Sequence, residues 1–282
     1  MTTGSMLLAG AVGRLRTAGI DDPAVDARLL LAHALEVDRS RLTLVLQDDV
    51  TPDQAAAFER AIEARLDRQP VAQIVGQRAF YGRDFIVTPY VLDPRPDTEL
   101  LVDLALSAPF ENVLDLGTGS GCILLSLLAE RPDAVGQGVD LSDKALAVAH
   151  RNAVQLDVQD RVTLHEGSWF DAIDDAARFD LIVSNPPYIT QDEMTVLSPE
   201  VRDWEPHMAL TPGGDGLDAY RIISKVAPEY LAVGGRLLLE IGHLQAAAVT
   251  DLCRAAGFQT VDAHQDLAGK DRVVAASDYM AV

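Results

Sequence analysis

The stretch Asn112–Gly121, which reads NVLDLGTGSG, decides the fold. Its first half, Asn112–Leu116, has the short apolar run of a buried strand, and its second half has three glycines that permit a sharp turn. A helix is predicted directly afterwards, over Cys122–Glu130. In folds that join a buried strand, a glycine turn and a helix in this way, ligands bind at the carboxyl ends of the strands.

The sequence that follows alternates between strand and helix patterns. This alternation predicts an α/β fold with a mostly parallel sheet covered by helices on both faces. Helices are expected at about 98–107, 122–130, 142–156, 219–231 and 244–256, and strands at 112–116, up to 140, and at 162–165, 179–184, 236–241, 258–262 and 272–276.

The sequence that precedes this region contains helix signals and no strand-like alternation. Asp22 before Pro23 is typical of a helix start in which the aspartate oxygen caps the first turn. Thr51–Gln54 fits a capping box with proline at the first helical position. These signals predict a small helical domain.

A short connector separates the two regions. Two apolar runs flank Gly82 within 79–87 and predict a hairpin, and prolines soon afterwards exclude regular helix or central strand. We therefore expect a small helical domain at 1–75, a β-hairpin linker at 76–95 and an α/β domain at 96–282.

The composition narrows the classes of partner. The chain has 23 basic and 43 acidic residues, and the net charge of −20 would repel a phosphate backbone. Cys122 and Cys253 belong to no metal-binding cluster, and the six histidines show no metal spacing, so no metal is predicted. No signal peptide and no run of about 18 apolar residues is visible. We expect a cytoplasmic protein that acts on a protein or a small molecule, with no nucleic-acid or membrane partner.

The glycines indicate the kind of cofactor. A dinucleotide fingerprint requires a third glycine where Cys122 stands, whereas this chain has glycines at 117, 119 and 121, with Asp115 two residues before the first. Alone, this spacing leaves three possibilities open: a methyl-donor site, another kind of nucleotide site, or simply a tight turn. Asp140, at the end of the next strand, is a candidate acceptor for two ribose hydroxyls, and Trp169 for packing on adenine.

Asn185-Pro186-Pro187-Tyr188 indicates the chemistry, because it follows the strand at 179–184 and so shares a rim with the glycine loop. The Asn185 side-chain oxygen and the Pro186 carbonyl can accept both hydrogens of a planar NH2 group, on which Tyr188 can stack. Such a nitrogen is a poor nucleophile, so the rate must come from orientation and from hydrogen bonds that strengthen in the transition state. The pattern predicts methyl transfer from S-adenosylmethionine to an amide or amino nitrogen.

Taken together, these motifs resemble the release-factor glutamine methyltransferases, the family called PrmC or HemK. The resemblance covers nearly the whole chain. It implies a Rossmann-like class I methyltransferase domain, with a mostly parallel seven-stranded sheet, beside a small helical domain. The matching motifs are Pro94–Glu99, Asp115–Gly121, Asn185–Tyr188, Glu200–Pro206, Gly213–Asp218 and Lys270–Arg272.

The resemblance also implies a substrate and a site. The substrate would be the glutamine of the Gly-Gly-Gln motif in class 1 peptide chain release factors. Two positions depart from the usual pattern: Asp93 replaces an aliphatic residue and Ser168 replaces an aspartate. The catalytic residues that the resemblance implies are Asn185, Pro186 and Tyr188. The implied substrate contacts are Asn185, Pro186, Pro187 and Tyr188. The implied cofactor contacts are Gly117, Thr118, Gly119, Ser120, Gly121, Asp140, Trp169 and Asn185.

Other functions remain open at this point. The same chemistry suits a ribosomal-protein glutamine or an exocyclic amino group of a nucleic acid, although the net charge argues against the latter. Cys122 in the fingerprint argues against a nicotinamide-dependent oxidoreductase. The intact Asn185 and glycine loop argue against a binding module without activity.

Overall fold

The computed structural model describes residues 2–279 of the chain. These residues form two compact units. The first, here called the helical unit, comprises residues up to Gln77 together with Ser198–Trp204. The second, the α/β unit, comprises Arg78–Leu197 and the residues from Glu205 onward.

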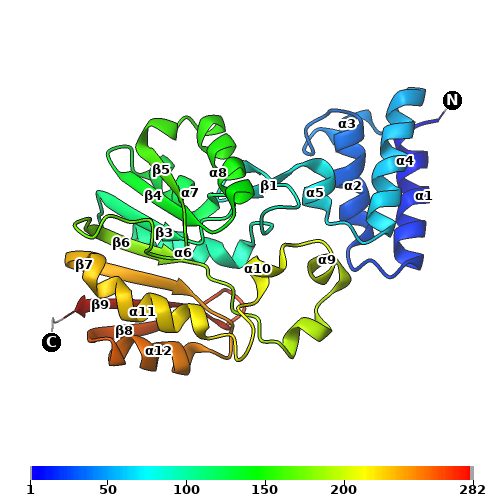
Figure 1. Ribbon diagram of the computed structural model, residues 1–282. Coiled ribbons are helices and arrows are strands. Elements are labelled where there is room, and N and C mark those ends of the chain that lie inside the picture. The colour runs from blue at the N-terminus through cyan, green and yellow to red at the C-terminus, as the bar shows by residue number, and fades with distance from the viewer. Residues whose placement is uncertain (1, 280–282) are drawn as a thin grey trace. The chain divides into compact units, whose positions relative to one another are not determined.

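Five helices lie in the described part of the helical unit before Gln77 (Figure 1). Its core is formed mainly by large apolar side chains such as Leu15, Leu30, Phe58 and Ile62. These helices are α1 (Gly4–Thr17), α2 (Pro23–Ala34), α3 (Leu42–Val45), α4 (Pro52–Leu66) and α5 (Val71–Val75).

The two helix starts expected in this unit have different outcomes. The capping box of α4 is confirmed, because the Thr51 and Gln54 side chains each bond to the other residue's backbone. The prediction that Asp22 caps α2 is wrong, since its side chain makes no capping hydrogen bond. Pro23 alone sets this start, because its fixed φ suits the first helical position.

The separate segment Ser198–Trp204, which includes α9 (Pro199–Arg202), is held in the helical unit by polar contacts. Glu200 pairs with Arg65 at 3.0 Å and with Arg68 at 3.2 Å. The Trp204 indole donates to the Asp67 carbonyl, and the Gln73 amide donates to the Trp204 carbonyl. A loop that leaves the α/β unit is therefore anchored on helical residues far away in sequence.

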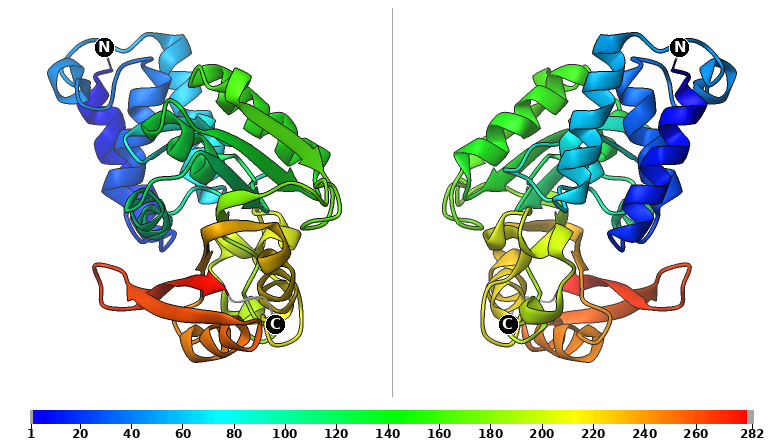
Figure 2. Two further views of the ribbon diagram at one scale, coloured as in Figure 1. Left: turned by 90° about the vertical axis from the view of Figure 1, so that its left-hand side faces the viewer. Right: turned by 90° about the vertical axis from the view of Figure 1, so that its right-hand side faces the viewer.

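The α/β unit is built on a seven-stranded sheet, which confirms the predicted fold (Figure 1). The strand order is β5-β4-β3-β6-β7-β9-β8, in which β3 to β7 are parallel and β9 is antiparallel to both neighbours. Figure 2 shows β8 and β9 side by side at the end of the chain. The strands are β3 (Asn112–Leu116), β4 (Val135–Asp140), β5 (Val162–Glu166), β6 (Phe179–Ser184), β7 (Leu231–Glu240), β8 (Phe258–Gln265) and β9 (Asp271–Tyr279).

Helices cover both faces of this sheet because successive strand residues point to opposite sides. In β3, Val113 packs in one core cluster with residues of α6 and α7, whereas Leu114 and Leu116 pack in the other with residues of α11 and α12. The covering helices are α6 (Glu99–Leu106), α7 (Cys122–Glu130), α8 (Asp143–Gln155), α11 (Asp218–Tyr230) and α12 (Ala246–Ala255). The short helix α10 (His207–Leu210) lies in the connection between β6 and β7.

Smaller elements complete the unit. They are the hairpin strands β1 (Gln77–Phe80) and β2 (Arg83–Ile86) and the 3-10 turns η1 (Pro96–Thr98), η2 (Gln159–Arg161) and η3 (Glu193–Val196). β3 and β6 have the predicted bounds, but β7 starts five residues earlier than expected, since two glycines at 234–235 hide the extended run. None of the described helices is long and apolar enough to cross a membrane.

Candidate active site

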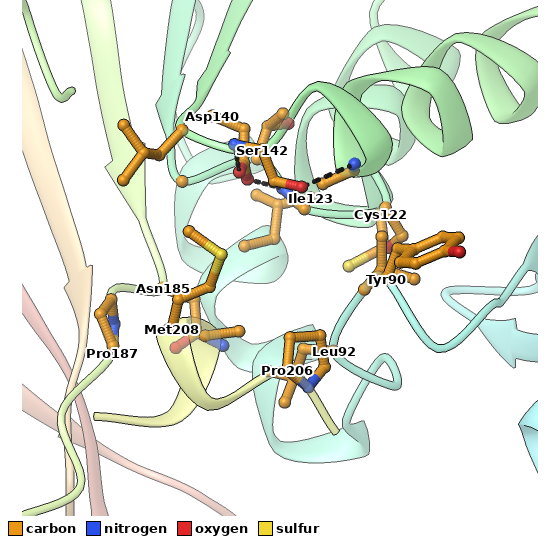
Figure 3. Close-up of a pocket in the computed structure, with 18 of the residues that line it drawn as sticks. Tyr90, Leu92, Cys122, Ile123, Asp140, Ser142, Asn185, Pro187, Pro206 and Met208 are labelled. Carbon is orange, nitrogen blue, oxygen red and sulfur yellow. Dashed lines mark hydrogen bonds between the residues drawn. The ribbon is translucent and has the colours of Figure 1, made fainter. Parts of the chain in front are cut away.

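The carboxyl ends of β3, β4 and β6 meet where the strand order reverses, the usual ligand position in such sheets. A cavity of ≈ 310 Å³ lies there within the α/β unit (Figure 3). Gly121, Pro186 and Tyr188 are not among its lining residues. The predicted site residues that line it are Gly117, Thr118, Gly119, Ser120, Asp140, Trp169, Asn185 and Pro187.

The glycine loop exposes its backbone to this cavity. The N–H groups of Gly117 and Thr118 both donate to the Val139 carbonyl, at 2.8 and 2.9 Å, which ties the loop to β4. A Cβ placed on Gly119 would meet nothing within 4 Å, so a ligand has room to approach the main chain there. Gly121 caps α7 with φ +79°, and a Cβ would lie 2.8 Å from Leu125, so this position requires glycine.

Asp140 is the acidic group of the cavity wall. Its Oδ2 accepts a hydrogen bond from Gly119 N at 2.8 Å, and its Oδ1 accepts one from Ser142 N at 2.9 Å (Figure 3). Burial raises the pKa of the Asp140 carboxyl, while these backbone bonds lower it. Because a carboxylate has about four acceptor sites, each oxygen keeps a lone pair for a ligand hydroxyl.

Asp115, by contrast, supports the loop from behind. Its side chain is fully buried, does not line the cavity, and accepts a hydrogen bond from Thr118 Oγ1 at 2.7 Å. Burial raises the pKa of this carboxyl to about 7. The acidic position of the glycine motif therefore fixes Thr118 and the turn.

Asn185 stands at the end of β6 and faces the cavity together with Pro187 (Figure 3). The end of this strand is fixed because Ser184 Oγ donates to the Leu116 carbonyl of β3 at 2.6 Å. Asn185 Nδ2 donates to Thr98 Oγ1 at 3.3 Å, and Thr98 is itself buried. Since its nitrogen is engaged by Thr98, the Asn185 side chain has its oxygen left for a ligand.

Tyr188 packs on protein rather than on the cavity. Its ring lies against the apolar core cluster shared with α11 and α12, and burial raises the pKa of its hydroxyl to about 12. Its carbonyl accepts a hydrogen bond from Gln245 Nε2 at 3.0 Å. The structure therefore gives Tyr188 a supporting place in the loop, and its stacking on a substrate stays a prediction.

Two further segments line the cavity without having been predicted from the sequence. One is 90–93, directly before the Pro94–Glu99 motif, and the other is 206–212, which overlaps the Glu200–Pro206 motif. Figure 3 shows Tyr90, Leu92, Pro206 and Met208 around the cavity. Only their position close to a motif in the sequence could have predicted these residues, because their apolar side chains are typical of any core position.

The departure at Asp93 places a carboxyl in a buried position. Burial raises its pKa, which the Arg78 guanidinium, 3.8 Å away, and Arg95 oppose. Next to it, Arg95 binds Glu205 through both carboxylate oxygens, at 2.7 and 2.8 Å. Ser168, the other departure, lines the cavity.

Comparison with known proteins gives matches across both units. The family model of the PrmC N-terminal domain matches residues 6–76, and that of the methyltransferase small domain matches residues 93–215. A release factor glutamine methyltransferase of Cereibacter sphaeroides is 58% identical over 269 residues, which cover 95% of this chain and 96% of the relative. A protein of the same name from Rhodospirillum rubrum is 44% identical over 280 residues, which cover 98% of this chain and 85% of the relative.

A solved structure agrees at the level of the fold. A methyltransferase from Pyrococcus furiosus superimposes with a TM-score of 0.56 over 79% of this chain and 100% of that chain, at 16% sequence identity. At this identity the likeness concerns the architecture alone.

Proposed function

The chain belongs to the family of release factor glutamine methyltransferases, and from this premise we propose its reaction. The protein transfers a methyl group from S-adenosylmethionine to the side-chain amide nitrogen of a release-factor glutamine, the one in the Gly-Gly-Gln motif of class 1 factors. The observation that carries the proposal is the shared cavity, where Asn185 faces the glycine loop and Asp140. The protein acts in the cytoplasm.

The residues of the cavity fit S-adenosylmethionine. The open backbone at Gly119 and the free lone pairs of Asp140 suit the amino-acid and ribose parts of the cofactor, and Trp169 suits its adenine. When bound, the cofactor supplies a methyl group that its positive sulfur has already activated. The protein therefore has to orient the acceptor rather than activate the donor.

The acceptor amide is oriented by hydrogen bonds to its two hydrogens. Asn185 Oδ1 accepts one, because Asn185 Nδ2 is already bound to Thr98. The Pro186 carbonyl is the proposed acceptor of the other, although Pro186 does not itself line the cavity. The transfer would form one bond, from the amide nitrogen to the methyl carbon, and break one, from that carbon to the cofactor's sulfur, which would keep the electron pair. The proton that the nitrogen then gives up would pass to water. Both acceptors gain strength as positive charge develops on the nitrogen.

Mass spectrometry tests this function. We expect the protein with labelled S-adenosylmethionine to place one methyl group on the Gly-Gly-Gln glutamine of an intact class 1 release factor. A factor with that glutamine changed to glutamate should take up no label. We also propose that the helical unit recognises the factor, so a short Gly-Gly-Gln peptide should have a higher KM than the intact protein. Label on any other residue would contradict the substrate, and equal KM values would contradict the recognition role.

Asp140→Ala is expected to weaken cofactor binding by about 100-fold, since it removes two hydrogen bonds to a charged acceptor, each contributing about 1.5 kcal/mol or more. It also removes the bonded partners of Gly119 N and Ser142 N. Isothermal titration calorimetry measures the affinity. Asp140→Asn keeps one acceptor oxygen, so its Kd for S-adenosylmethionine should lie between those of the wild type and Asp140→Ala. An unchanged Kd in Asp140→Ala would show that this residue is not part of the cofactor site.

A further inference from the structure

Glu240 is a buried carboxylate beside the candidate active site, yet no motif used so far includes it. It ends β7, and the pairing of Ser184 with Leu239 places it next to Asn185 at the carboxyl edge of the sheet. Its side chain is 1% exposed. Burying an ionisable carboxyl is costly, so such a group at a site is a candidate for a functional role.

The contacts of Glu240 lead directly to Asn185. Burial raises the pKa of the Glu240 carboxyl, and hydrogen bonding from the side chains of Thr98 and Asn185 acts against this effect. Asn185 Nδ2 also donates to Thr98 Oγ1 at 3.3 Å. Among the described residues, Glu240 Oε2 has no hydrogen-bond partner of its own. The Glu240 carboxylate therefore depends on Thr98 and Asn185 for hydrogen bonding, and these two side chains also contact each other.

We propose that Glu240 is a positioning residue which, together with Thr98, fixes the direction in which the Asn185 side-chain amide faces. The inference rests on the proposed function, in which Asn185 Oδ1 binds the acceptor amide. A carboxylate only accepts hydrogen bonds, so Asn185 must turn Nδ2 toward Glu240 and Oδ1 toward the cavity. A rotated amide would place its oxygen against the carboxylate and lose a charge-assisted bond. The preference is on the order of 10- to 100-fold.

The charge state of Glu240 controls this preference. Burial raises the pKa of its carboxyl to about 7, against the lowering effects of Thr98, Arg272 and Asn185, while Asp97 raises it further. Above pH 7 the anion holds Nδ2. Below pH 7 the protonated acid can itself donate to Asn185 Oδ1, so the preference is lost. Burial raises the pKa of three neighbouring groups, Tyr188, Tyr220 and Cys122, and the Glu240 carboxylate adds to each of these shifts.

Nuclear magnetic resonance of the bare protein tests the contact. The chain has three asparagines, Asn112, Asn152 and Asn185, so asparagine labelled with nitrogen-15 gives few side-chain signals, and Asn185→Ala assigns the relevant one. We expect this signal to titrate with a midpoint near pH 7 and to stop titrating in Glu240→Gln. The matched control is Glu205→Gln, since burial also raises the Glu205 pKa to about 7, and it should leave the titration unchanged. A signal that does not titrate, or that titrates equally in Glu240→Gln, overturns the proposal.

Kinetics and stability separate positioning from a structural role. The wild-type kcat should fall as the pH drops through about 7, whereas Glu240→Gln should be about 10-fold slower at pH 8 and nearly independent of pH. Its affinity for S-adenosylmethionine should stay unchanged. Burial also raises the pKa values of Asp115 and Glu205 to about 7, and both residues remain in this variant. If the kcat of Glu240→Gln still fell with the pH, Asp115 or Glu205 would be the cause and the proposal would be contradicted.

Stability should change in the opposite direction to activity. The folded-state pKa of Glu240 lies above its ordinary value of 4.5, so its protonation favours the folded protein. This contribution is lost as the pH rises from 4.5 through about 7. Glu240→Gln should therefore unfold at a higher temperature than the wild type at pH 8, and a lower temperature would indicate a structural role. If the wild type failed to methylate a release factor, that result would contradict only the proposed substrate, because the resonance titration needs no substrate.

Discussion

Asn185→Ala is expected to lower kcat for glutamine methylation by about 10³-fold while the Kd for S-adenosylmethionine changes less than about 3-fold. A single positioned group that stabilises developing charge contributes about 10² to 10³ in rate, and the acceptor amide also loses its fixed direction. The cavity keeps Asp140 and the glycine loop, which do not depend on the Asn185 side chain for any hydrogen bond.

Single-turnover kinetics with saturating cofactor, together with calorimetry of cofactor binding, measure this separation. Asp140→Ala is the complementary variant, since it should change the Kd far more than the rate at saturation. A melting temperature close to that of the wild type would show that Asn185→Ala is folded. Retained turnover in Asn185→Ala would contradict the proposed orientation of the acceptor, whatever the identity of the substrate.

The sequence predicts the parts of the site that lie within local motifs. Asn112–Leu116 and 179–184 form strands with the expected bounds, because each is a short apolar run, followed by Gly117 in the first case and by Asn185-Pro186 in the second. Since parallel strands end at one edge, the glycine loop, Asp140 and Asn185 meet as the motif order implies. The cavity therefore follows largely from local pattern and topology.

The residues that escape prediction depend on contacts between distant segments. Glu240 reads as the polar end of an apolar strand, and only the pairing of β6 with β7 places it beside Asn185. Likewise, nothing local shows that Ser198–Trp204 joins the helical unit, because Arg65 and Arg68 hold Glu200 across more than 130 positions of the chain. Nor does any local pattern show that the partly buried ring of Tyr188 lies against the core cluster shared with α11 and α12.

Gly216→Ala is expected to destabilise the protein by about 2–4 kcal/mol and to lower kcat by about 10²-fold. The third glycine of the Gly213–Asp218 motif has φ +75°, and a Cβ there would lie 2.3 Å from the Tyr188 carbonyl oxygen. That oxygen cannot easily withdraw, because Gln245 Nε2 holds it at 3.0 Å. The clash must therefore push the loop that carries Asn185, and a displacement of a fraction of an ångström there misaligns the acceptor.

Gly213→Ala in the same motif is the matched control. Gly213 has φ +82°, so alanine meets a similar backbone strain of about 1 kcal/mol, but its Cβ would have nothing within 4 Å. Urea unfolding and kcat at saturating substrates measure both variants. The difference between them isolates the contact with the Tyr188 carbonyl, since the cost of positive φ is common to both. If the two variants lost equal stability and equal activity, the close approach at Gly216 would have no part in holding the Asn185 loop, and the motif would serve the turn alone.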